Sequence, residues 1–291
     1  MADPALIPWL DAAWDDHADH PQRVLAQLEQ AAPELPDHAE GARAVRLAEH
    51  LWLAHLHDTA GLHRFLERLP AREALRPAVQ AALWAIDMID ARPAPMLPDA
   101  LRWRSLHNVA SALIALGRTA EARELLMDDE AAATASEDPA ARRAYAASAN
   151  NVAQDLRLGP RGDTARDTLM IDAAQLARRA WERAGTWLHI ERAEYELARC
   201  HAALGHGLQA LAHAHACLRG CEAGQADAME HFFAHEALAH AHRACGDAGS
   251  AEDEVERMRA LMQEISDPGL RALAQKSLGS LGSLGSLEAS A

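Results

Sequence analysis

Apolar residues recur every three or four positions along most of this chain, the spacing with which an α-helix buries one face. Between residues 40 and 57 the apolar stripe falls at Ala44, Leu47, Leu51 and Ala54. Similar spacing predicts further helices at residues 62–69 and 76–89, followed by four helix pairs. The predicted pairs are 99–116 with 119–128, 138–157 with 163–184, 187–204 with 207–222, and 227–245 with 248–265.

A frame of small residues recurs three times around a glycine. Its members are Val109-Ala110 with Gly117 and Ala122, Leu197-Ala198 with Gly205 and Ala210, and Leu238-Ala239 with Gly246 and Ala251. Each glycine follows one alanine and precedes the next at the same spacing. Glycine favours the tight turn that ends a helix, and alanine lets two helices approach closely. We therefore expect stacked helical hairpins.

The pattern divides the chain into five segments. Residues 1–90 are expected to form divergent N-terminal helical hairpins. Residues 91–98 hold Pro93, Pro95 and Pro98 and are expected to form a break, because proline removes backbone donors. Residues 99–266 carry the repeats, and residues 267–276 are expected to be a C-terminal capping helix. Residues 277–291 repeat Ser-Leu-Gly, which predicts a flexible tail.

Residues 101–264 resemble the tetratricopeptide-repeat (TPR) family, in the long-helix form found in bacterial regulatory and sensor modules. The three frames carry the resemblance, although the family's consensus Trp, Tyr and closing Pro are missing. The resemblance implies an all-α fold, a right-handed α-α superhelix, in which the first helix of each pair lines a concave groove. Stacked helix pairs of this kind usually hold another molecule.

The resemblance also implies which side chains face that groove. They are Arg192, Tyr195, Arg199, Phe233, Glu236, His240 and Arg243. An arginine fork can bind a carboxylate while aromatic rings offer flat apolar area, so we expect exposed residues that bind an acidic or C-terminal peptide segment. The alternative is that these arginines only pair with the nearby Glu191, Glu194 and Glu196.

Composition supports a helical chain without polyanionic partners. Hydrophobic residues make up 49% of the 291 residues but aromatic residues only 4%, which favours closely packed helices over sheets. The net charge of −15 repels nucleic acid and anionic membranes. The chain has no run of 18 apolar residues and no basic, then apolar, N-terminal stretch. We therefore expect a cytoplasmic protein with reduced cysteines.

Histidine and cysteine are concentrated between residues 200 and 245, which hold all four cysteines and eight of the 17 histidines. His213, Cys217 and Cys221 are spaced by four and form one helical stripe; His231, His235 and His242 form another. This arrangement leaves open an alternative function, a metal-responsive regulatory module that binds zinc or copper. The chain lacks C-x-x-C and H-E-x-x-H spacing, so neither metal nor cofactor is predicted.

Motifs for catalysis are also missing from the sequence. It contains no G-x-S-x-G elbow, no P-loop and no G-x-G-x-x-G, and the glycine-rich segment 159–162 lacks the lysine of a phosphate cradle. The prediction is therefore a non-catalytic scaffold or adaptor that binds a protein or peptide. Alanine-rich outer helices leave homo-oligomer formation open.

Overall fold

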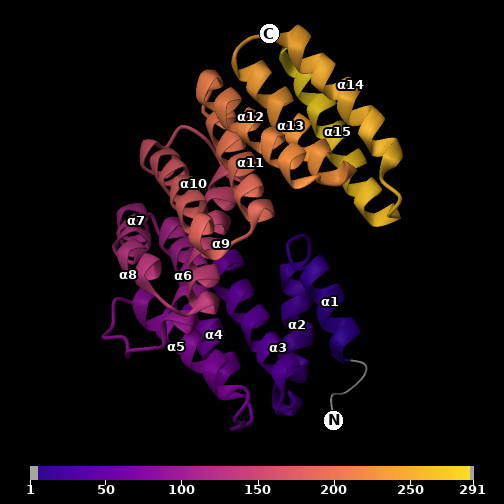
Figure 1. Ribbon diagram of the computed structural model, residues 1–291. Helices are drawn as coiled ribbons and strands as arrows, with labels where there is room; N and C mark the ends of the chain where they lie inside the picture. Colours follow the sequence, from indigo (N-terminus) through magenta and orange to yellow (C-terminus); the bar gives the residue numbers. More distant parts are fainter. Residues whose placement is uncertain (1–5, 289–291) are drawn as a thin grey trace. The chain divides into compact units, whose positions relative to one another are not determined.

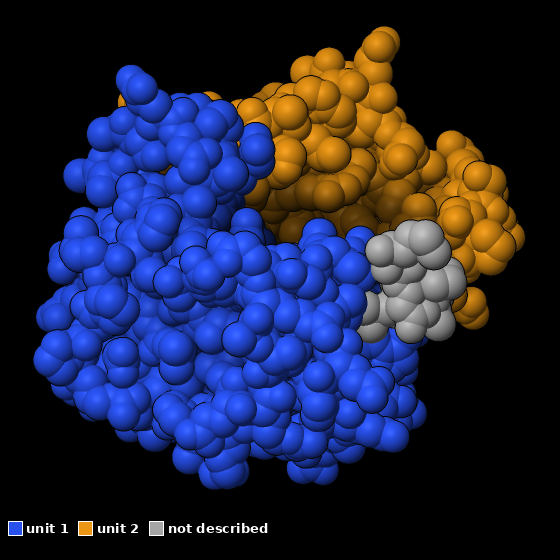
Figure 2. Space-filling model, turned by 90° about the horizontal axis from the view of Figure 1, so that it is seen from below, with its two compact units in different colours: residues 1–152 blue, residues 153–291 orange. Residues whose placement is uncertain are grey.

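The computed structural model describes residues 6–288, and these residues form helices connected by turns, without a strand. The predicted all-α class is confirmed. Contacts group the chain into two compact units, Met1–Val152 and Ala153–Ala291 (Figure 2). In the part described, no helix combines the length and the apolar character that crossing a bilayer requires.

The first unit contains the helices α1 to α8 and most of α9 (Figure 1). Their bounds are α1 Leu6–Asp16, α2 Pro21–Ala31, the short η1 Ala32–Glu34, α3 Ala39–His50, η2 Leu51–His55, α4 Thr59–Glu67, α5 Arg76–Ile89, α6 Asp99–Ala115, α7 Thr119–Asp128, α8 Glu130–Ala135 and α9 Pro139–Leu158. Helix α3 packs against α1 and α5, and α6 packs against α5, α7 and η2.

One helix of the first unit departs from the α-helix predicted over residues 40–57. The α-helix ends at His50, and residues 51–55 form the π-helical turn η2, in which the Leu56 amide donates to the Leu51 carbonyl at 3.0 Å. A π turn uses one more residue per hydrogen-bonded loop than an α turn. Apolar spacing does not reveal such a turn, because Leu51 and Leu53 are buried within it.

The second unit is a succession of long helices, each packed against the next (Figure 1). They are α10 Thr164–Ala184, α11 Trp187–Ala203, α12 Gly207–Gly224, α13 Ala228–Ala244, α14 Ala248–Glu264 and α15 Pro268–Glu288. Helix α11 also contacts α13. Contacts between sequence neighbours and next-but-one helices are consistent with a helical solenoid.

The three predicted turns share one backbone conformation. Gly117, Gly205 and Gly246 have φ between 72° and 76°, which a residue with a Cβ adopts only at a cost. The amide of the residue after each glycine donates to a carbonyl five residues earlier, as in a Schellman motif. The donors and acceptors are Arg118 and Leu113, His206 and His201, and Asp247 and His242, at 2.8–2.9 Å.

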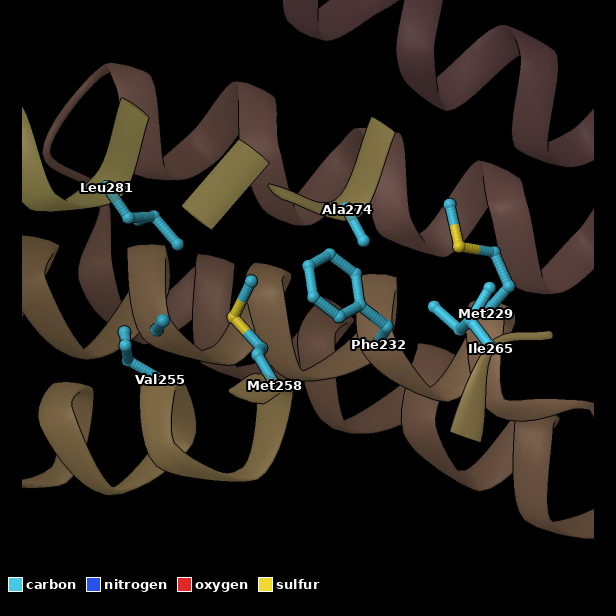
Figure 3. Packing of buried hydrophobic residues seen from close by; sticks show 8 residues of the cluster. Met229, Phe232, Val255, Met258, Ile265, Ala274 and Leu281 are labelled. Carbon is cyan, nitrogen blue, oxygen red and sulfur yellow. The ribbon is translucent and has the colours of Figure 1, made fainter. Parts of the chain in front are cut away.

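Small residues of the frame lie at the helix contacts, as predicted. Ala198 and Ala210 are fully buried where α11 meets α12, and Ala239 and Ala251 are buried where α13 meets α14. Larger side chains fill the space beside them. In the C-terminal cluster, Phe232 lies among residues of α13, α14, α15 and the segment between α14 and α15 (Figure 3).

Two segments differ from the sequence-based division. Residues 92–98 are not helical, as expected, but they lie inside the first unit, and the division between the units falls within α9. Residues 277–288 were predicted to belong to a flexible tail, but they are helical, because α15 continues to Glu288. Among the described side chains of α15, Leu281 is fully buried against the second unit's core and Leu278 packs against the same cluster. Residues 289–291 of the predicted tail lie outside the described residues.

Candidate functional site

Glu236 is the centre of a polar network on α11, α13 and α15. Glu236 is 4% exposed. Its carboxylate accepts two hydrogen bonds and forms one ion pair, each at 2.8 Å. The donors are the Tyr195 hydroxyl, the Arg199 guanidinium and the Ser277 hydroxyl. A carboxylate buried this deeply needs such partners, because an unpaired buried charge is costly. The structure therefore brings Tyr195, Arg199 and Glu236 together.

Arg199 links the two other members of this group. Its Nη1 donates to the Tyr195 hydroxyl at 2.6 Å, and its guanidinium carbon lies 5.5 Å from the centre of the Tyr195 ring. The Tyr195 ring in turn meets Phe233 edge to face, with centroids 5.7 Å apart. Burial raises the pKa of Tyr195 well above its usual range and keeps the hydroxyl protonated, so that it can donate to Glu236.

His240 lies one helical turn after Glu236, and its Nε2 has no hydrogen-bond partner. Its Nε2 is buried and 3.9 Å from the nearest Glu236 oxygen. Burial lowers the pKa of His240 well below its usual range, and Arg199 and Arg243 add to the shift. The ring is therefore neutral at physiological pH, and its Nε2 is an orphaned polar atom beside the network.

Helix α15 lies against the same residues. Ser277 bonds Glu236, and Arg243 Nη1 donates to the Leu281 carbonyl at 2.8 Å. Phe233 packs against the cluster that contains Ala274 and Leu281. Helix α13 thus already holds one helix of the chain, through a hydroxyl, a carbonyl and apolar contacts.

The predicted residues are consequently less exposed than expected. The side chains of Arg199 and Glu236 are 15% and 5% exposed, because they pair with each other and because Ser277 of α15 lies against Glu236. Arg192 differs: its side chain is 60% exposed and forms an ion pair with Glu230. Phe233, Glu236 and Arg243 therefore contact α15, Tyr195, Arg199 and His240 lie beside Glu236, and Arg192 is exposed to solvent.

The glutamates proposed as alternative partners bind other groups. Glu196 forms a bidentate ion pair with Arg157, at 2.7 and 3.1 Å, and both side chains are almost fully buried. Glu194 binds Arg178 and His213. No local sequence pattern predicts the Arg157–Glu196 pair, because the two residues lie 39 positions apart on different helices.

The three members of the predicted stripe on α12 all contact α11, but through different glutamates. His213 turns to Glu194 at 2.7 Å, whereas Cys217 and Cys221 turn to Glu191. On α13, His235 binds Glu254 and His242 lies near Asp247. Most of these histidines therefore have carboxylate partners on neighbouring turns or helices.

Glu191, Cys217 and Cys221 form a buried group that could hold a metal ion. The Cys217 and Cys221 thiols lie 2.8 and 3.4 Å from the same Glu191 oxygen. Burial raises the pKa of Glu191 to about 7, and Cys221, together with burial, raises the pKa of the Cys217 thiol. Protonated thiols that donate to the carboxylate account for this geometry without a metal.

A second group with metal-binding geometry lies in the first unit: His17, His50 and His55. The spacing of these residues does not predict the group, because they come from two segments and because residues five apart do not share a face of an α-helix.

Neither a protein-family model nor a curated protein matches the chain.

Proposed function

We propose that the protein is a non-catalytic scaffold of TPR-like helical hairpins, whose second unit binds a protein or peptide partner on the face formed by α11 and α13. The observation that carries the proposal is that α13, on this face, holds a helix of the chain itself, α15, through Glu236 and Arg243. A surface that binds one helix by apolar packing and a few polar bonds is suited to a helical segment of a partner.

The charges beside this face favour a partner with an acidic group. Arg157, Arg199 and Arg243 stand against Glu196 and Glu236, which leaves one positive charge in excess. Arg243 carries that excess, because it donates to a neutral carbonyl, that of Leu281. A carboxylate that displaces this carbonyl would form a charge-assisted hydrogen bond, which is stronger than a bond to a neutral acceptor.

Selection from a displayed library of helical peptides on the full chain tests the proposal. We expect enriched peptides to carry Asp or Glu, and Arg243→Ala to weaken their binding by about ten-fold or more, because a hydrogen bond to a charged group contributes about 1.5–3 kcal/mol. Arg259→Ala is the matched control, since Arg259 is an exposed arginine on α14. Absence of enrichment, or equal losses in both variants, would reject this face as the binding surface.

A second candidate function rests on the Glu191, Cys217 and Cys221 group. Three ligand atoms within 4.8 Å of one another would allow a zinc- or copper-responsive module in residues 200–245. Metal analysis of the Cys217→Ser and Cys221→Ser variants tests it. Stoichiometric metal that is lost in both variants would support this function over a scaffold role alone.

A further inference from the structure

The imidazoles of His17, His50 and His55 converge on one point of the first unit. His50 Nε2 lies 3.2 Å from His17 Nε2 and 3.2 Å from His55 Nε2. The three rings are half-buried, and each pair of ring centres is separated by 4.8–5.3 Å. Three nitrogens of the same kind therefore face one another.

Hydrogen bonds on the far side of two rings fix where their protons lie. His17 Nδ1 contacts the Trp14 carbonyl, and His50 Nδ1 contacts the Asn108 side-chain oxygen at 2.9 Å. The Asn108 amide nitrogen donates to Glu49 at 2.8 Å, which fixes the orientation of the amide. Both acceptors are oxygens, so each Nδ1 carries the hydrogen and each Nε2 of a neutral ring is a bare lone pair.

Two bare lone pairs at 3.2 Å repel each other unless a cation lies between them. Zinc binds imidazole nitrogen at about 2.0–2.1 Å in tetrahedral geometry, which separates neighbouring nitrogens by about 3.3 Å. The separations in the structure match that value. Histidine ligands commonly donate their other N–H to a carbonyl or carboxylate, and His17 and His50 do so to a carbonyl and an amide oxygen.

The backbone is built to bring His50 and His55 together. In an α-helix, residues five apart point about 140° away from each other. The π turn η2 follows His50 directly and ends at His55, and it brings the two rings to 4.8 Å between centres. π turns inside helices occur frequently at functional sites. His17 directly follows the last residue of α1, a helix that packs on α3, and it supplies the third nitrogen.

We propose that His17, His50 and His55 bind a divalent transition-metal ion, with zinc as the ion whose geometry they match. Asn108 and Trp14 act as positioning residues that orient the imidazoles of His50 and His17. Three histidines leave one position of a tetrahedral ion for water or another ligand. The proposal is independent of the peptide-binding face, because all of its residues lie in the other unit.

Titration of the full, untagged chain with zinc alone tests the proposal after the protein has been stripped with a chelator. We expect one ion per chain, and a loss of affinity of about 100-fold or more in His50→Ala and in His55→Gln. Asn108→Leu is expected to weaken binding by about 10–100-fold, as changes to groups behind a ligand do. X-ray absorption of the zinc complex should show a nitrogen shell at about 2.0–2.1 Å with imidazole scattering.

Two controls separate this site from other zinc binding. His63→Gln removes an exposed histidine on α4 and should leave affinity unchanged, as should Cys217→Ser. Circular dichroism establishes that each variant is folded, and His55→Gln retains the size and polarity of the side chain if His50→Ala does not fold. Less than one ion per chain, unaltered affinity in folded His50 and His55 variants, or loss of zinc only in Cys217→Ser would overturn the proposal.

Discussion

Alanine at the helix contacts allows the close packing of the second unit. Ala198 and Ala239 are fully buried, so a larger side chain has no space without movement of a whole helix. We expect Ala198→Leu or Ala239→Leu to lower the free energy of unfolding by about 1–3 kcal/mol, measured by urea denaturation. Ala260→Leu, on the exposed side of α14, should change it by no more than about 0.5 kcal/mol. Equal effects at both kinds of position would contradict close helix contact.

His201 makes stability sensitive to mild acid. It is 7% exposed, stacks on His213 and lies near His206, while Glu194 faces His213. Burial, with His213 and His206, lowers the pKa of His201 to about 4, below the usual value of 6.5. His201 therefore binds a proton at a higher pH in the unfolded chain than in the folded chain. The free energy of unfolding falls as pH decreases from about 6.5 to about 4.

Replacement of His201 by glutamine tests this pH dependence. We expect His201→Gln to reduce the slope of the free energy of unfolding against pH between 6.5 and 5, because glutamine at position 201 does not bind a proton in this range. The exposed His215→Gln serves as the control and should retain the slope of the original protein. An unchanged slope in His201→Gln would show that other histidines cause the acid sensitivity.

Helix α15 shows how packing can fix a segment of low complexity. Its Ser-Leu-Gly repeat has weak helix propensity because of glycine, yet Leu281 is buried and Ser277 bonds Glu236. We expect Leu281→Ala to lower the free energy of unfolding by about 2–5 kcal/mol, as deletion of a buried leucine does. Leu273→Ala, at a leucine that is 48% exposed, should cost less than about 1 kcal/mol. A negligible effect of Leu281→Ala would restore the prediction of a flexible tail.

Local sequence signals predicted the helices and turns well, but not what joins distant segments. Glycine and alanine spacing identified the hairpins of α11 to α14, since the turn and the contact depend on residues near in sequence. The face around Glu236 was predicted from the TPR resemblance, but its cover by α15 was not, because leucine in a repetitive tail carries no helix signal of its own. The three histidines of the first unit were missed because a π turn has no sequence signature.

Across the whole molecule, the two proposed sites lie in different compact units, each with its own buried residues. Zinc at the three histidines would stabilise the first unit, by about 2.7 kcal/mol at a hundred-fold excess over Kd. We expect hydrogen exchange to slow in residues 6–108 on addition of zinc, and exchange in α11 to α14 to stay unchanged. Slower exchange around Cys217 instead would place the ion at the other candidate group.

The half-buried position of the three imidazoles has a consequence for ligand exchange. Cobalt(II) in place of zinc would make the protein coloured, because a tetrahedral cobalt centre absorbs visible light strongly. A small anion such as azide would then change that colour if it replaces the water opposite the histidines. The hue of the solution would thus tell whether this position is open to molecules from outside.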